Sequence, residues 1–493
     1  MARRRKHRSV FGRIIRRAAF ATVALLLLIV VARVWDTSHG PPLSLWHTHV
    51  PAELPRAEID GADWARYVAA EEAMFAETRR SVTDLLEAED RTPANRFFAG
   101  SPLNPARFAR DWNRSFILEP EGAPLGAAVF LHGLTDAPFS LRHVAEDYRA
   151  RGYLAIAIRM PGHGTVPAGL TDATWEDWAA ATRLAVREAR ARVGPDRPLH
   201  LVGYSNGGAL ALKYALDAIE DQNQPRAERI VLISPMVGVT AFARFAGLAA
   251  LPALLPRFAR TAWLDIQPEF NPFKYNSFPV NAARQSYRLT AALQEQLERL
   301  SAAGRLDALP PILTFQSVVD ATVSTRAVLT SLYARLPQNG SELVLFDLNR
   351  SATFGPLFRT AADTILDRIV TPAPRSFGLT VVSNLAPDAS EVEARSTPAG
   401  TREDTRTPLE LAWPRGVFSL SHVALPFPPQ DGLYGAEPDP TDSFGIALGA
   451  IAIRGERGVL IVGMDTFSRV TSNPFFPYLR ARIVADLPQP APR

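Results

Sequence analysis

Cysteine is absent from this chain of 493 residues. Its absence excludes disulfide bonds, cysteine-ligated zinc, iron–sulfur clusters, thiol catalysis and a lipid anchor attached to cysteine. It leaves the cellular compartment open, because an oxidising compartment also tolerates proteins without cysteine. Lysine is scarce too: Lys6, Lys213 and Lys274 stand against a large excess of arginine. This bias favours a bacterial source with GC-rich DNA.

Acidic residues are missing from residues 1–17, which contain eight basic residues. The other 476 residues contain 46 basic and 50 acidic residues, so the net charge of +4 comes from this short tail. The rest of the chain is mildly acidic, which gives no support for nucleic-acid binding. With 47% hydrophobic and 21% charged residues, the composition also excludes general disorder.

Charged residues are also absent from residues 18–32, and the apolar run continues beyond Arg33. A membrane-spanning helix needs about 20 apolar residues, so we predict a transmembrane anchor at 18–35. A cleaved signal peptide is the alternative, although no small-residue cleavage site follows the run. The positive charge before the run predicts that residues 1–17 form a basic cytoplasmic tail. The predicted location is a bacterial inner membrane, crossed once, with the remaining chain in the periplasm or outside the cell.

Residues 36–113 are predicted to form a linker and an N-terminal helical extension. Residues 36–56 are rich in proline, whereas residues 62–90 have apolar positions at helical spacing. The pair His47 and His49 has the spacing of metal ligands, but no acidic or histidine cluster nearby completes a site. We therefore expect a solvated linker there, and no metal.

After this extension, short apolar runs alternate with helical patterns, which predicts a mostly parallel sheet with helices on both faces. Two segments are longer than a crossover needs: a predicted helical cap at about 236–309 and an extra insertion at about 349–415. The predicted strands are 127–132, 153–160, 199–204, 229–234, 312–319, 342–348 and 377–384, and the predicted helices are 140–151, 174–193, 207–219, 325–336 and 476–486.

The sharpest motif is Gly203-Tyr204-Ser205-Asn206-Gly207, a G-x-S-x-G sequence. It follows an apolar strand and opens a predicted helix, as a nucleophile elbow does. The tight turn holds the serine at the strand tip, and the helix N-terminus supplies N–H groups for a developing oxyanion. The motif predicts Ser205 as a nucleophile; an ordinary turn with a capping serine is the alternative.

Several further motifs follow one another along the chain in the order found in the α/β-hydrolase superfamily, and the chain therefore resembles that superfamily. The chain is most similar to the branch that contains monoglyceride lipases, lysophospholipases and serine aminopeptidases. The resemblance implies an α/β-hydrolase domain over residues 114–493, with a helical cap. The motifs that carry it are FLHGLTD at 130–136, RMPGHG at 159–164, GYSNGG at 203–208, VVDATV at 318–323 and SHV at 421–423.

The resemblance also implies roles for particular residues. The backbone N–H groups of Leu134 and Asn206 would form the oxyanion hole, and His132 and His163 would have structural roles. The order of the triad in this fold is serine, acid, histidine. His422 is the only histidine after Ser205, so it is predicted as the general base of the triad.

Two carboxylates could be the acid of the triad. Asp320 directly follows the strand at 312–319 and begins a loop similar to the acid turn of the family. Asp347 lies at the end of the next strand, where the competing role is a pair with Arg350. We predict Asp320 as the catalytic acid and keep Asp347 as the alternative.

The expected function is that of a membrane-anchored serine hydrolase. The substrate would be a carboxylic ester with an apolar acyl part, as for a lysophospholipase, a monoglyceride lipase or a carboxylesterase, and catalysis would proceed through an acyl-enzyme. We expect no cofactor and no metal, and as partners a lipid or small ester and the membrane. A peptidase or amidase on the same scaffold, and a non-catalytic binding module of the cell envelope, are the alternatives.

Overall fold

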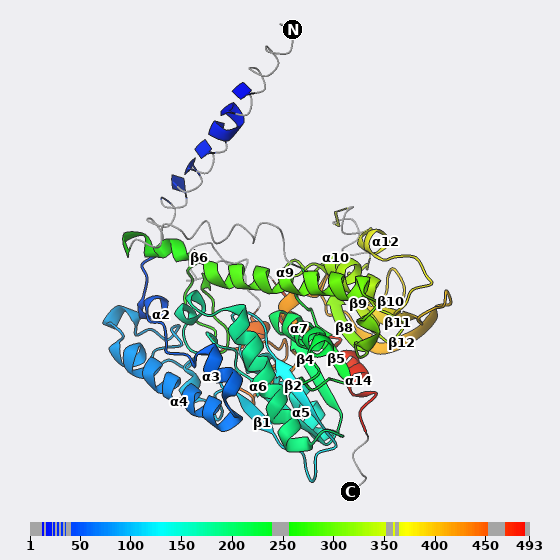
Figure 1. Ribbon diagram of the computed structural model, residues 1–493, viewed down its shortest axis with the longest axis horizontal. Helices are drawn as coiled ribbons and strands as arrows, with labels where there is room; N and C mark the ends of the chain where they lie inside the picture. The colour runs from blue at the N-terminus through cyan, green and yellow to red at the C-terminus, as the bar shows by residue number, and fades with distance from the viewer. Residues whose placement is uncertain are drawn as a thin grey trace.

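A ten-stranded sheet forms the centre of the computed structural model, in the order β1-β3-β2-β4-β5-β8-β9-β10-β11-β12 (Figure 1). The structure describes residues 41–238, 256–351, 358–359, 364–451 and 469–488, and short pieces between 12 and 35. Neighbouring strands from β3 to β10 in this order run parallel, whereas β1, β11 and β12 pair antiparallel at the two edges. The predicted mostly parallel sheet is therefore confirmed.

The strands of the sheet are β1 (Phe116–Leu118), β2 (Gly126–Leu131), β3 (Tyr153–Ile158), β4 (Leu199–Tyr204), β5 (Arg229–Ile233), β8 (Ile312–Ser317), β9 (Glu342–Phe346), β10 (Gly378–Asn384), β11 (Glu391–Thr397) and β12 (Thr405–Ala412). A second, two-stranded sheet pairs β6 (Trp263–Asp265) with β7 (Phe278–Pro279). The α-helices are α2 (Leu45–Thr48), α3 (Arg56–Gly61), α4 (Trp64–Ser81), α5 (Arg142–Ala150), α6 (Trp175–Val193), α7 (Asn206–Glu220), α9 (Val280–Ala302), α10 (Thr325–Ala327), α12 (Ile365–Ile369) and α14 (Phe476–Val484).

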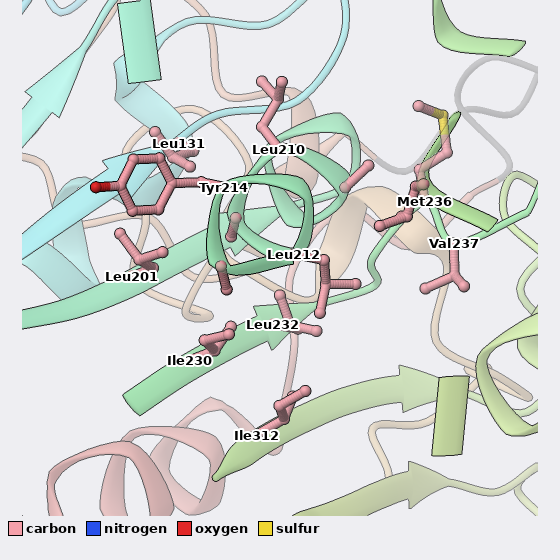
Figure 2. Packing of buried hydrophobic residues seen from close by; sticks show 14 of the residues in the cluster. Leu131, Leu201, Leu210, Leu212, Tyr214, Ile230, Leu232, Met236, Val237 and Ile312 are labelled. Carbon is pink, nitrogen blue, oxygen red and sulfur yellow. The ribbon is translucent and has the colours of Figure 1, made fainter. Parts of the chain in front are cut away.

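Helices cover both faces of the sheet because its central strands alternate apolar side chains up and down. In β2, Val129 and Leu131 join the cluster under α6, α7 and α9, whereas Phe130 joins the cluster under α5 and α14. Figure 2 shows Leu212 of α7 close to Leu232 of β5, with Leu201 of β4 in the same cluster. Each fully buried leucine contributes about 1.5–3 kcal/mol to folding, so this packing holds the tip of β4 in place.

The predicted insertion at about 349–415 adds strands to the sheet, and its predicted strand at 377–384 is β10. Its strand β10 pairs parallel with β9, and β11 and β12 extend the sheet further. The polar composition of residues 386–408 hid β11 and β12, because β12 is the edge strand and most of its side chains are exposed.

The structure does not show the predicted cap at about 236–309, which it describes only in part. Residues 239–255, the apolar part of the prediction, lie outside the described residues. Helix α9 covers the sheet beside α7, with Leu289, Leu293 and Leu297 in the core cluster (Figure 1). The predicted helix at 325–336 begins with α10 but continues as a π-helical turn and a 3₁₀ turn.

The predicted anchor at 18–35 is described only in part. Within the described residues, no helix combines the length and the apolar character needed to cross a membrane.

The N-terminal extension is folded where the sequence suggested a solvated linker. His47 is buried, and its Nε2 lies 3.0 Å from Ser277 Oγ. Burial lowers the pKa of His47 to about 4, so the ring is neutral and satisfied by protein contacts rather than by solvent or a metal. The predicted helix at 62–90 ends early, at Ser81, and 3₁₀ turns follow.

A buried ion-pair network joins this extension to the sheet. Arg159, at the end of β3, donates from Nε to Glu71 of α4 (3.1 Å) and from both Nη atoms to Glu53 (2.8 Å each). The side chains of Arg159 and Glu71 are 2% and 3% exposed, so water does not screen this pair. The hydroxyl of Tyr67 donates to the Arg159 carbonyl (2.7 Å).

We predict that Arg159→Met lowers the free energy of unfolding by about 3–5 kcal/mol, because it leaves the buried Glu71 without its counter-charge. Urea unfolding measures this loss. The control is Arg183→Met, which breaks the more exposed pair with Asp60 and should cost no more than about 1 kcal/mol. Equal losses in the two variants would contradict the prediction.

Candidate active site

Ser205 lies in a strained turn between β4 and α7. Its backbone has φ 53° and ψ −116°, a conformation that costs a residue with a side chain about 1–3 kcal/mol. The turn is tight: a Cβ atom on Gly203 would lie 2.5 Å from the Gly207 carbonyl oxygen, and one on Gly207 would lie 1.8 Å from that of Leu131. Glycine is therefore required at both positions, and this geometry is that of a nucleophile elbow.

Asp320 and His422 are brought together across 102 positions of the chain. His422 Nδ1 lies 2.8 Å from Asp320 Oδ2, and both side chains are almost fully buried. Because Nδ1 donates to the carboxylate, Nε2 is the ring nitrogen that remains for a reacting group. The rings of His422 and Tyr204 stack with centroids 5.3 Å apart, which fixes the plane of the imidazole.

The Asp320 carboxylate is held by four donors. Its Oδ1 accepts the backbone N–H groups of Thr322 (2.8 Å) and Val323 (3.0 Å), and its Oδ2 also accepts Gln316 Nε2 (3.1 Å). Burial alone would raise the pKa of Asp320, but the bond from His422 and these amides hold the pKa below its usual value. The group is therefore a carboxylate at neutral pH. Sequence analysis missed Gln316, whose only signal is its place four residues before the acid.

Asp347, the alternative acid, lies at the end of β9 and forms the pair with Arg350 that was its competing role. Its carboxylate accepts from Arg350 Nε (2.7 Å) and from Arg350 Nη2 (3.2 Å). The structure therefore brings Asp320, and not Asp347, to His422.

The loop after β2 lies against the serine. A Cβ atom on Gly133 would be 3.3 Å from Ser205 Cβ, so the following residue, Leu134, is beside the elbow. The N–H of Asn206 is the first of α7, and the first N–H groups of a helix have no partner within it. Both predicted oxyanion donors thus come from backbone next to Ser205. Within the described part of the chain, the buried side-chain amide of Asn206 has no hydrogen-bond partner.

His132 and His163 hold the loops around the elbow. His132 Nδ1 donates to the Gly133 carbonyl (2.9 Å), and its Nε2 accepts the Met160 N–H (3.0 Å). Burial lowers the pKa of His132 to about 3 and lowers that of His163 as well. Both rings are neutral, as their structural roles require.

One cluster outside this site could be mistaken for a metal site. Among the described residues, His143, Asp431 and Asp442 lie close enough together to share an ion. However, Arg142 donates to Asp431 (2.7 Å) and to Asp442 (2.6 Å), and its guanidinium supplies the positive charge that a metal would bring. The cluster is an ion-pair network that ties α5 to the segment after His422, and sequence analysis did not identify it.

Comparisons with known proteins give one family match and two relatives. Residues 122–349 match the family described as serine aminopeptidase, S33. The chain is 29% identical over 181 residues to a thermostable monoacylglycerol lipase of Bacillus sp. strain H-257, covering 36% of this chain and 67% of the relative. It is 26% identical over 117 residues to the phospholipase YtpA of Bacillus subtilis strain 168, covering 24% of this chain and only 42% of that relative.

Among solved structures, one of the metagenome-derived lipolytic enzymes LipS and LipT is similar, with 23% identity and a TM-score of 0.37. That match covers 48% of this chain and 86% of the solved chain.

The mostly parallel sheet and the elbow are those of an α/β-hydrolase fold, and the chain is similar to the monoglyceride lipase-like branch of that superfamily. The family match and the monoacylglycerol lipase relative support a hydrolase of the lipase and esterase type.

We predict that Asp320→Asn lowers kcat on an ester substrate by up to about 10⁴-fold, because the histidine loses the group that sets its tautomer and stabilises its charge. Asp347→Asn is the matched control, since it removes a buried strand-end carboxylate paired with arginine. Its kcat should stay within about threefold of wild type, with circular dichroism confirming that both variants are folded. The reverse pattern would assign the acid to Asp347.

Proposed function

We propose that the chain is a serine hydrolase that cleaves carboxylic esters with an apolar acyl part through an acyl-enzyme. The observation that carries this proposal is the hydrogen bond between Asp320 and His422 at the sheet edge that also holds the strained Ser205. The similarity to a monoacylglycerol lipase and to a phospholipase supports lipid esters as the substrate class.

Each step of the proposed reaction is assigned to a residue of the candidate site. Ser205 Oγ attacks the ester carbonyl and passes its proton to Nε2 of His422, while Asp320 stabilises the imidazolium. The backbone N–H groups of Leu134 and Asn206 bind the oxyanion, and each such donor contributes about 10²–10³-fold to the rate. His422 then gives this proton to the departing alcohol as the ester C–O bond breaks, which leaves Ser205 acylated. In the second half His422 takes a proton from water, whose oxygen bonds to the acyl carbon. The bond to Ser205 Oγ then breaks, His422 returns the proton to Oγ, and the carboxylic acid leaves.

An aminopeptidase activity is less well supported than ester cleavage. It needs a carboxylate free to bind the substrate amine, and Glu269 and Glu295, in the segment predicted as the cap, are the candidates. Glu269 is fully buried, and its oxygens already accept the N–H groups of Asn276 (3.1 Å) and Ser277 (2.8 Å). Glu295 is exposed on α9, the helix that packs beside α7.

A non-catalytic binding module would have no use for the strain at Ser205 or for a buried, charged Asp320. Both features cost stability, and both have a function in acyl transfer.

We predict that a fluorophosphonate probe labels the wild-type protein and that Ser205→Ala abolishes labelling. Ser301→Ala, at the end of α9, is the matched control and should be labelled like wild type. In the same experiment, an ester should turn over at least 100 times faster than the amide with the same acyl group. An unlabelled wild-type protein would favour the binding module, and comparable ester and amide rates would favour a peptidase.

We also propose that residues 18–35 anchor the protein in a bacterial inner membrane, with residues 1–17 in the cytoplasm. This proposal rests on the sequence alone, that is, on the apolar run and the eight basic residues before it.

Alkaline phosphatase fused after residue 60 should be active, because this reporter works only outside the cytoplasm. A cytoplasmic reporter at the same junction should be inactive, and extraction with carbonate should leave the fusion in the membrane. The opposite pair of signals would refute the location, and release by carbonate would refute the anchor.

A further inference from the structure

A cavity of about 400 Å³ is lined in part by neighbours of the candidate active site. Val423, next to His422, lines one wall. Tyr275 lines another, and its N–H donates to the carbonyl of Thr135 (2.7 Å), the residue after Leu134. The cavity therefore adjoins both the segment that carries the histidine and the segment bonded to the oxyanion loop. Two larger hollows, of about 480 and 720 Å³, are lined by residues away from this site.

Two cationic side chains line this cavity, and they make it unusual for an ester-binding site. One is Lys274, partly buried in the wall, and the other is Arg469 at the exposed rim. Among the described residues, no carboxylate forms an ion pair with Lys274. Burial lowers the pKa of Lys274, the charge of Asp136 opposes this, and Arg469 adds to it. The ammonium is thus only partly compensated by the protein around it.

The wall that carries Lys274 is held rigidly. The buried guanidinium of Arg96 donates from Nη1 to the carbonyls of Asn271 (3.0 Å) and Lys274 (3.4 Å). Asn271 Nδ2 in turn lies 2.6 Å from the hydroxyl of Tyr434, which also lines the cavity. This arrangement fixes the backbone that carries Lys274 before any ligand binds, which reduces the entropy lost on binding.

One carboxylate, Asp265, also lines the cavity. It is exposed and accepts a hydrogen bond from Gln267 Nε2 (3.0 Å). The cavity lining therefore has more positive than negative charge, and the partly buried charge is the positive one. Apolar groups, among them Phe270 and Leu448, complete the lining.

We infer that this cavity binds an anionic group, a phosphate or a carboxylate, on the alcohol part of the ester substrate, with Lys274 as its main partner and Arg469 closing the rim. This inference rests on the proposed ester hydrolysis by Ser205. It names the substrate class: acylglycerols with a charged headgroup, as in lysophospholipids, are preferred over neutral monoglycerides.

The test compares two soluble substrates with the same acyl chain, 1-hexanoylglycerol and 1-hexanoylglycerol 3-phosphate. The short chain keeps both in solution, so attraction to a charged micelle does not contribute. The wild-type protein should have the higher kcat/KM for the phosphate. Lys274→Gln should lower the ratio of the two kcat/KM values by about 10- to 100-fold, since a hydrogen bond to a charged group is lost.

Matched variants separate the effect of losing the positive charge from an effect on folding. Lys274→Arg should keep most of the preference, whereas Arg469→Gln at the exposed rim should lower the ratio by a few-fold without unfolding the protein. Lys213→Gln, which breaks a pair with Asp217 on α7, removes the same charge elsewhere and should leave the ratio unchanged. Glycerol 3-phosphate should inhibit competitively, and inorganic phosphate should inhibit only weakly if the ligand is a headgroup rather than free phosphate.

Labelling of Ser205 by the fluorophosphonate is read in every variant. A wild-type protein that is labelled but prefers the neutral ester, or a ratio that Lys274→Gln and Arg469→Gln both leave unchanged, would overturn the anionic subsite while leaving the hydrolase intact. A protein that is not labelled at all would overturn the proposed function itself.

Discussion

The buried pairing of Arg159 with Glu71 and Glu53 is the interaction on which the rest of the site depends. A guanidinium in a low-dielectric interior is tolerated only with its counter-charges in place, so the N-terminal extension must dock for the end of β3 to form. The same arginine donates to the carbonyls of Met160 (3.2 Å) and His163 (3.0 Å), which shapes the loop after β3. The N–H of Met160 then binds His132, and His132 is joined to the oxyanion loop. The extension is therefore part of the catalytic framework, although it contributes no reacting group.

The remaining groups meet because parallel strands end at one edge of the sheet. Ser205 follows β4, Asp320 comes shortly after β8, and the oxyanion loop follows β2, which neighbours β4. Charged groups at such an edge can have different surroundings, and their pKa values can therefore differ. The hydrogen bond from His422 and the backbone amides of Thr322 and Val323 hold the pKa of Asp320 below its usual value, whereas burial raises the pKa of Asp136, one residue after Thr135, to about 6. The two carboxylates thus differ in environment, and only Asp320 is bonded to the histidine.

The sequence predicted those parts of the molecule that are encoded by short-range patterns. Apolar runs located the central strands, and the elbow motif located Ser205, because both depend on neighbouring residues. The acid stayed a choice between Asp320 and Asp347, since each ends a strand and only tertiary contacts separate them. Edge strand β12 was not predicted, because its side chains are mostly exposed and its sequence has the polar composition of a loop. Buried His47 escaped because its partner, Ser277, is 230 positions away, and no local pattern records such a contact.

Strands β10–β12 lie between the acid and the histidine along the chain, yet His422 is still bonded to Asp320. The returning segment is tied down just before the histidine. Ser317 Oγ, at the end of β8, donates to the Leu420 carbonyl (2.9 Å), and Asn349, after β9, donates to the carbonyls of Phe418 and Val417 (2.9 Å each). The entropic cost of closing a loop grows only slowly with its length. These hydrogen bonds can therefore hold His422 in position for different lengths of the chain between β9 and His422. The added strands can therefore vary while the geometry of Asp320 and His422 is kept.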